Sequence, residues 1–294
     1  MKLALVGQGY WGSKISKECE TLGIETEIFE INDDLSTIDP GRYFGAIVAT
    51  PAEDHVKSAI RLLENKNNLL IEKPIAMNNN ELLDLKKYIT KEKIMVGHIL
   101  IYNELYSEVK KQISNLKHIH VRRNAWGRLK RNITPILNLA PHDIALLDDI
   151  FQKQPISVYS HGVYVSGQSQ PDTVFCFLDY DNVQVTLELG WYNHEKIRKI
   201  NFVCNDKHVV WNDVSKTVQV KELYLDQQAR QQEGNSYTLD ITEKKSPLQN
   251  QINAFQEYCL ENKLPITNLH HAERVTIVVD ALEKSLKENK RIYL

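Results

Sequence analysis

The chain has 294 residues, which at the usual ~150 residues per domain corresponds to two domains, each large enough to bury a core. Its 42% hydrophobic and 25% charged residues and its formal net charge of -2 create no field that would attract nucleic acid or an anionic membrane. The 4 cysteines form no CxxC pair, and no apolar run reaches the ~20 residues of a spanning helix or resembles a signal peptide. We therefore expect a cytoplasmic protein with no nucleic-acid or membrane partner.

Short apolar runs alternate with amphipathic stretches as far as about Gly97. The runs cover residues 3–6, 26–29, 46–49, 69–71 and 94–96. Between them, segments such as 55–65 and 80–91 carry apolar residues at helical spacing. Because parallel strands need crossover connections, this order predicts a doubly wound parallel sheet with helices on both faces, the Rossmann class, over residues 1–118.

The pattern changes after residue 118 to longer alternating runs. We predict a helix over residues 141–151 and strands over 158–165, 173–178, 183–189, 200–203 and 217–223. The polar segment 226–245 is predicted to be a loop, followed by closing helices over 247–262 and 271–288 that can pack back on the first domain. Residues 119–294 are thus predicted to form an α+β domain with an open, largely antiparallel sheet for substrate binding and oligomerisation.

A glycine motif follows the first predicted strand directly and opens a helix over residues 13–22. It comprises Gly7, Gln8, Gly9, Tyr10, Trp11 and Gly12. Glycines here permit a tight turn and close approach to a pyrophosphate, while the helix N-terminus offers free N–H groups to the anion. The alternative is a glycine-rich turn that binds nothing, but strand, turn, helix and a downstream acid together favour a dinucleotide site.

That acid is Glu30, at the end of the second predicted strand. A carboxylate there accepts hydrogen bonds from ribose hydroxyls and repels a 2′-phosphate, so NAD is favoured over NADP. The alternative is a glutamate that is merely solvated at the end of a strand. The neighbouring residues Asn32 and Asp33 can share the predicted contact to the ribose.

Further polar residues follow the later strands, where the ligand crevice of open α/β sheets lies. We predict cofactor contacts from Thr50, Pro51, His55, Glu72 and Lys73. Lys73 also points to catalysis, because an ammonium can stabilise negative charge developing on a substrate oxygen. Tyr102 is predicted on the substrate side.

These motifs resemble those of the glucose-fructose oxidoreductase, inositol dehydrogenase and MocA family. The likeness rests on Val6–Gly12, 49–51, 72–74 and 138–143, and continues at Gly190-Trp191, Pro247-Leu248 and Ser285-Leu286. It implies an active site between a Rossmann domain and an open-sheet domain, a catalytic-site lysine at Lys73 before a cis Pro74, and a general acid/base at His142. A homodimer or homotetramer is also expected.

One position departs from the family pattern. Asn138 stands four residues before His142, where the family commonly has Asp. On a helix or turn the two side chains share a face, so Asn138 can bind the substrate or orient His142 but cannot take a proton. Proton transfer then falls to His142 and Lys73, with Asn138 in the same catalytic set and Trp191 lining the substrate side. Taken alone, a solvated lysine and a hydrogen-bonded histidine are the ordinary alternatives.

A basic stretch precedes this motif and contains Arg122, Arg123, Arg128, Lys130 and Arg131. It is either a solvated loop or a contact to an anionic substrate such as a nucleotide sugar, with Arg123 the residue assigned to substrate binding. The neighbouring histidine pairs, His118 with His120 and His270 with His271, lack a ligand pattern, so we assign no metal.

These features predict an NAD(H)-dependent dehydrogenase or reductase acting on CH–OH groups of a sugar, polyol or nucleotide sugar. One alternative is a reductase of a C=N or conjugated bond, against which His142 argues. The other is a non-catalytic NAD-binding regulatory protein, which the Asn138 departure keeps open.

Overall fold

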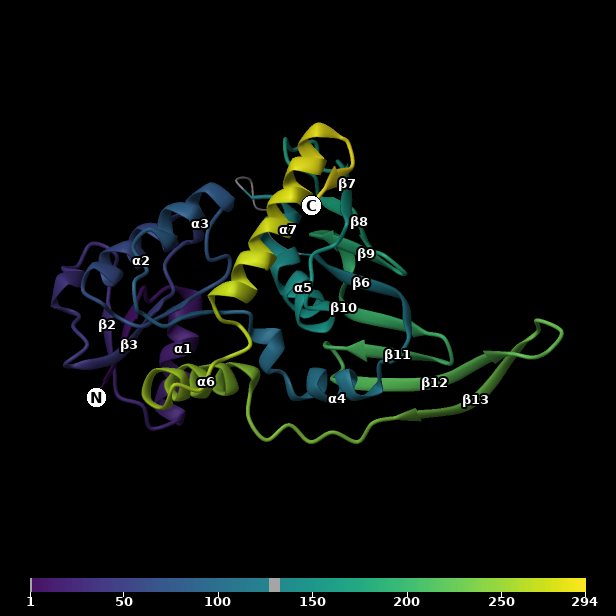
Figure 1. Cartoon of the computed structure of the whole chain (residues 1–294), viewed down its shortest axis with the longest axis horizontal. Coiled ribbons are helices and arrows are strands. Elements are labelled where there is room, and N and C mark those ends of the chain that lie inside the picture. Colours follow the sequence, from purple (N-terminus) through teal and green to yellow (C-terminus); the bar gives the residue numbers. More distant parts are fainter. Residues whose placement is uncertain (1, 127–132) are drawn as a thin grey trace. The chain divides into compact units, whose positions relative to one another are not determined.

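A computed structural model of the protein describes residues 2–126 and 133–294 (Figure 1). The chain divides into two compact units. The first unit comprises residues 1–103 and 245–277, and the second comprises residues 104–244 and 278–294.

The first unit is built on a five-stranded parallel sheet in the order β2-β1-β3-β4-β5. The strands are β1 (Lys2–Val6), β2 (Thr26–Phe29), β3 (Tyr43–Val48), β4 (Leu69–Ile71) and β5 (Ile94–Val96). The helices are α1 (Tyr10–Thr21), α2 (His55–Glu64), α3 (Asn79–Lys86) and α6 (Pro247–Glu261), with the short helices η1 (Leu35–Thr37), η2 (Ala52–Asp54) and η3 (Ile99–Tyr102). The predicted Rossmann sheet is confirmed.

Alternate residues of β1 enter two different cores. Leu3 and Leu5 pack in a cluster with Phe255 of α6, whereas Ala4 and Val6 belong to a second cluster. Side chains alternate across a strand, and both faces of this one are buried, so its sequence is continuously apolar. This burial explains why the short parallel strands were predictable from apolar runs.

The second unit contains a nine-stranded sheet in the order β13-β12-β11-β10-β6-β9-β8-β7-β14. Its strands are β6 (Leu116–Trp126), β7 (Ser157–Val163), β8 (Thr173–Tyr180), β9 (Val183–Gly190), β10 (Tyr192–Cys204), β11 (Lys207–Asn212), β12 (Thr217–Leu225), β13 (Gln231–Thr238) and β14 (Ile292–Tyr293). Among these described strands, β6 and β9 pair in parallel and the other neighbours pair antiparallel. The predicted largely antiparallel sheet is confirmed.

The helices of this unit are α4 (Glu104–Gln112), α5 (Pro135–Phe151) and the later part of α7 (Leu269–Glu288). The predicted start of α5 at residue 141 is wrong, because the helix begins at Pro135 after the N-cap Thr134 and continues through Pro141. Proline suits the first turn of a helix, and Pro135 is the residue that occupies it. The buried side chains of Ile136, Ala140 and Ile144 extend the apolar face across Pro141.

The segment predicted as a loop over residues 226–245 contains strand β13, which pairs with β12 in a hairpin that extends beyond the rest of the sheet (Figure 1). Most side chains of β13 are exposed, so its sequence carries no apolar alternation. The strand is held by backbone pairing with β12 and by polar contacts such as that of Lys221 with Glu233. Within the described ranges, no helix has an apolar stretch long enough to cross a bilayer.

Candidate cofactor and substrate site

The glycine turn connects β1 to α1 at the carboxyl edge of the parallel sheet. Gly7 has a φ of +97°, and a Cβ there would lie 2.8 Å from the carbonyl oxygen of Ala49. A Cβ on Gly12 would overlap the carbonyl oxygen of Gly7. The fold itself therefore requires glycine at both positions.

Gly9 is different, because the surrounding protein does not require a glycine there. It is the N-cap of α1 with a φ of -64°, and a Cβ would meet no atom within 4 Å. No side-chain cap occupies the N-terminus of α1, and Gln8 and Tyr10 are exposed beside it. A bare, open backbone at a helix N-terminus fits the pyrophosphate of a dinucleotide, which accepts hydrogen bonds from such N–H groups.

Glu30 lies exposed immediately after β2. Its backbone N–H donates to Oδ2 of Asp33 at 2.7 Å, and the Asp33 N–H donates to the Glu30 carbonyl at 3.0 Å. These two bonds close a tight turn in which the Asp33 carboxylate accepts a hydrogen bond from the backbone. The Glu30 carboxylate is exposed beside this turn, and its predicted ribose contact stays a prediction.

His55 braces the two loops that follow β3 and β4. Its Nδ1 lies 2.7 Å from the carbonyl oxygen of Pro74, and its Nε2 lies 2.9 Å from that of Thr50. Burial lowers the pKa of His55 below its usual value, and a neutral ring can donate to only one of these carbonyls. The ring thus supports the backbone behind Lys73, and its predicted contact to the cofactor is a separate, open prediction.

The Glu72-Lys73-Pro74 motif follows β4, and the Lys73–Pro74 peptide bond is cis, as the family resemblance implied. Glu72 is buried, accepts the Lys73 backbone N–H at 3.3 Å and lies so close to Gly97 that a Cβ there would be 2.7 Å from its Oε1. Burial raises the pKa of the Glu72 carboxyl. Glu72 therefore faces the interior of the strand end, and Lys73 is half-buried.

The sequence did not predict that two buried histidines near Lys73 would pair. The rings of His98 and His271 meet edge to face with centroids 5.4 Å apart. Burial, then His271 and Lys73, lower the pKa of His98 well below its usual range, so the ring is neutral at physiological pH. The only signal in the sequence is the position of His98 two residues after the end of β5, since its partner comes from distant α7.

Tyr102 ends η3 within the first unit. Its hydroxyl shares a hydrogen bond of 2.8 Å with Oγ1 of Thr267, and its carbonyl accepts from Nδ2 of Asn250 at 3.2 Å. These bonds hold the ring in place, and its role toward a substrate stays a prediction.

In the second unit, α5 carries Asn138 and His142 one turn apart, so both half-buried side chains share one face of the helix. The next residue, Asp143, is fully buried and accepts two hydrogen bonds from Arg123 of β6, at 2.8 Å from Nε and 2.6 Å from Nη2. This bidentate pair fastens α5 to the sheet and leaves the adjacent His142 on another side of the helix.

Arg122 and Arg123 belong to strand β6, so the loop alternative is wrong for these two residues. Nε of Arg122 donates to Glu188 on β9 at 2.9 Å. The other three cations of the basic stretch, Arg128, Lys130 and Arg131, lie outside the described residues. The ion pair gives Arg123 a structural role, and its predicted substrate contact is not tested.

Trp191 is buried directly after β9, and its backbone N–H donates to the Asp172 carbonyl at 2.9 Å.

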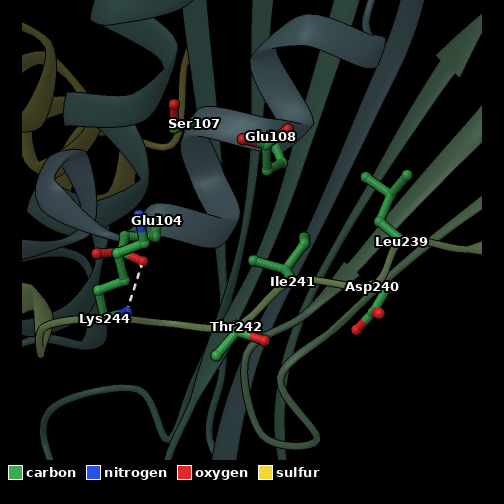
Figure 2. A pocket seen from close by; sticks show the side chains of 8 residues that line it. All are labelled: Glu104, Ser107, Glu108, Leu239, Asp240, Ile241, Thr242 and Lys244. Carbon is green, nitrogen blue, oxygen red and sulfur yellow. Dashed lines mark hydrogen bonds between the residues drawn. The ribbon is translucent and has the colours of Figure 1, made fainter.

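A pocket of about 570 Å³ in the same unit is lined by Glu104, Ser107, Glu108, Leu239, Asp240, Ile241, Thr242 and Lys244. Figure 2 shows these side chains on α4 and the 239–244 segment, with the Lys244 N–H donating to Oε2 of Glu104 at 2.9 Å. None of the predicted site residues lines this pocket. Over the described part of the chain, no cluster of three or more His, Cys, Asp or Glu side chains could hold a metal.

The sheet, the glycine turn and the open helix N-terminus together form a Rossmann fold with the features of a dinucleotide site. Residues 13–98 match the model of the glucose-fructose oxidoreductase, inositol dehydrogenase and MocA family, described as an oxidoreductase family with an NAD-binding Rossmann fold. This match confirms the predicted resemblance and confirms NAD as the cofactor.

Solved structures resemble the chain over nearly its whole length. UDP-N-acetylglucosamine 3-dehydrogenase GnnA from Acidithiobacillus ferrooxidans has a TM-score of 0.83 at 14% identity, covering 98% of both chains. A putative oxidoreductase from Magnetospirillum magnetotacticum has a TM-score of 0.82 at 17% identity, covering 96% of this chain and 99% of that one. Putative oxidoreductase yvaA from Bacillus subtilis reaches 0.81 at 15% identity over 100% and 98%. At these identities the likeness shows a shared fold and no more. The search of curated proteins found no match.

Proposed function

We propose that this NAD-binding oxidoreductase transfers a hydride between nicotinamide and a carbinol or ketone carbon of a sugar, polyol or nucleotide sugar. The observation that carries the proposal is the pairing of Asn138 and His142 on one face of α5. An amide that binds hydroxyl groups beside an imidazole that exchanges protons suits a polyhydroxylated substrate. The fold shared with a nucleotide-sugar dehydrogenase supports the same substrate class.

The cofactor would be held by the Gly7–Gly12 turn, with Glu30 at the ribose. When bound, the nicotinamide supplies or accepts the hydride. Lys73 is proposed to donate a hydrogen bond to the reacting oxygen and to stabilise negative charge on it. His142 is proposed to take the hydroxyl proton during oxidation and return it during reduction, while Asn138 orients the substrate.

Turnover of a substrate panel tests this proposal. Purified protein is mixed with NAD and UDP-N-acetylglucosamine, other nucleotide sugars, free sugars or inositols, and nicotinamide absorbance is followed. We expect NADH formation with at least one hydroxylated substrate and its loss in His142→Ala. An Asn138→Ser variant should raise KM more than it lowers kcat, because Asn138 binds rather than exchanges protons.

Two results would contradict the proposal. Reduction of an imine or conjugated double bond, with no turnover of alcohols or ketones, would favour the C=N or conjugated-bond reductase. Tight binding of NAD without turnover across the whole panel would favour a regulatory protein, for which the amide at Asn138 in place of a carboxylate is the specific feature.

A further inference from the structure

A carboxylate from another helix lies at the start of α5. Glu283 of α7 accepts a hydrogen bond at Oε1 from the Thr134 hydroxyl, and the same oxygen accepts the Leu137 backbone N–H at 3.1 Å. The Leu137 N–H is shared with Oγ1 of Thr134, also at 3.1 Å. Glu283 therefore joins the N-cap of α5 to α7 within the second unit.

The N-terminus of a helix favours an anion, because its first N–H groups lack partners within the helix and carry the positive end of the helix dipole. Thr134 alone could cap α5, since its side chain already accepts the Leu137 N–H. Burial nevertheless raises the pKa of Glu283, against the hydrogen bonds from Thr134 and Leu137, which lower it, and with Asp280 raising it further. A second, half-buried acceptor at a helix that already has a cap requires an explanation other than capping.

Two contacts that hold α5 in place explain the second acceptor by their positions on the helix. Glu283 holds the helix at Leu137, and the buried ion pair with Arg123 holds it at Asp143. Asn138 and His142 are the residues immediately inside these two anchors. A rotation or shift of the first turn would move both side chains together, because they lie on one rigid helix.

We infer that Glu283 is a positioning residue that fixes Asn138 and His142 through the first turn of α5. The expected effect of Glu283 on turnover rests on the proposed function, whereas its expected effect on the start of α5 does not. The link from α5 to α7 uses an acceptor oxygen rather than a charge, because Oε1 of Glu283 accepts from both the Thr134 hydroxyl and the Leu137 N–H. Glu283→Gln should therefore preserve the arrangement, and Glu283→Ala should lose it. Glu288→Ala is the matched control, because Glu288 lies on the same helix and pairs with Lys290 at the surface.

The experiment measures the full-length variants in three ways. Hydrogen exchange reports the amides at the start of α5, NMR of histidine-labelled protein reports the His142 ring, and NAD reduction with UDP-N-acetylglucosamine reports turnover. The His142 resonance is assigned from its absence in His142→Gln. Thermal unfolding and NAD titration show that each variant is folded and binds cofactor.

In Glu283→Ala we expect faster exchange at Leu137, a displaced His142 resonance and a kcat reduced by roughly 10- to 100-fold, the scale of a misplacement of about 1 Å. Glu283→Gln and Glu288→Ala should match the wild type in all three. A His142 resonance that is unchanged in Glu283→Ala overturns the inference and leaves Glu283 as a helix cap. If the wild type does not turn over, the proposed function fails, and the exchange and NMR results still decide the role of Glu283.

Discussion

Glu30 is the residue on which the preference for NAD over NADP depends. Its exposed carboxylate after β2 should accept ribose hydrogen bonds and repel a 2′-phosphate. We expect NAD(H) to bind more tightly than NADP(H) by on the order of tenfold, which corresponds to about 1.4 kcal/mol. Calorimetric titration with both cofactors measures this ratio, and Glu30→Ala should narrow it. Equal binding of the two cofactors by the wild type would remove Glu30 from this role.

His98 should make stability depend on pH. Its pKa in the folded state lies well below the usual 6.5, so below pH 6.5 the unfolded chain binds a proton that the folded chain does not. The free energy of unfolding should therefore fall as the pH drops from 6.5 toward the folded pKa, with His98 contributing up to ~1.4 kcal/mol per pH unit. His55, whose pKa is also lowered by burial, acts in the same direction.

Urea unfolding at several pH values between about 7 and 5 measures how the free energy of unfolding depends on pH. His98→Gln should make the slope shallower, whereas His194→Gln, at an exposed position, should not. An identical slope in wild type and His98→Gln would show that the buried imidazole is not the group responsible.

The ion pair between Arg123 and Asp143 predicts a stability effect rather than an affinity effect. Removing one partner leaves the other charge buried, which typically costs about 3–5 kcal/mol. Arg123→Met and Asp143→Leu should each destabilise the protein strongly, and the double variant should be more stable than either. Chemical denaturation measures all three. If Arg123→Met instead leaves stability unchanged and weakens nucleotide-sugar binding, Arg123 is the substrate contact that the sequence suggested.

At the scale of elements, the glycine turn offers a comparison between two neighbouring glycines. Gly7→Ala places a Cβ against the Ala49 carbonyl at a positive φ, so we expect a clear loss of stability. Gly9→Ala enters open space and should change the free energy of unfolding by less than about 1 kcal/mol. NAD binding should nevertheless weaken in Gly9→Ala, because the methyl group occupies the surface that the pyrophosphate approaches. Unimpaired NAD affinity in Gly9→Ala would contradict the placement of the cofactor on this turn.

Elements with buried faces could be predicted from the sequence, and elements defined by long-range pairing could not. The strands β2, β4 and β5 coincide with the predicted runs at 26–29, 69–71 and 94–96. The residues of β4 and β5 are all buried and apolar, whereas β2 is a partly exposed edge strand that contains Thr26 and Glu27. Strand β6 was missed because charged side chains such as Arg122 and Arg123 interrupt its alternation and find partners on β9 and α5. Strand β13 was missed because an exposed edge strand needs no apolar side chains.

At the scale of the whole molecule, contiguous motifs could be recognised in the sequence, whereas contacts between residues far apart in the chain could not. The glycine turn and the Glu72-Lys73-Pro74 motif are contiguous in sequence, so their chemistry could be read directly. The His98–His271 pair and the contact of Glu283 with Leu137 join residues far apart in the chain. Both depend on where α7 packs, which no local pattern determines.

The central proposal is that Lys73 and His142 act in one proton transfer at one substrate oxygen. Single-turnover hydride transfer, followed by nicotinamide absorbance across pH, tests it most directly in Lys73→Ala, His142→Ala and the double variant. We expect each single change to slow transfer by ~10²–10⁴-fold. NAD should still bind, because the glycine turn and Glu30 hold the cofactor even when the predicted contact of Lys73 is lost. The double variant should be little slower than the worse single variant, since both residues act on the same step. Full activity in both single variants would contradict the account.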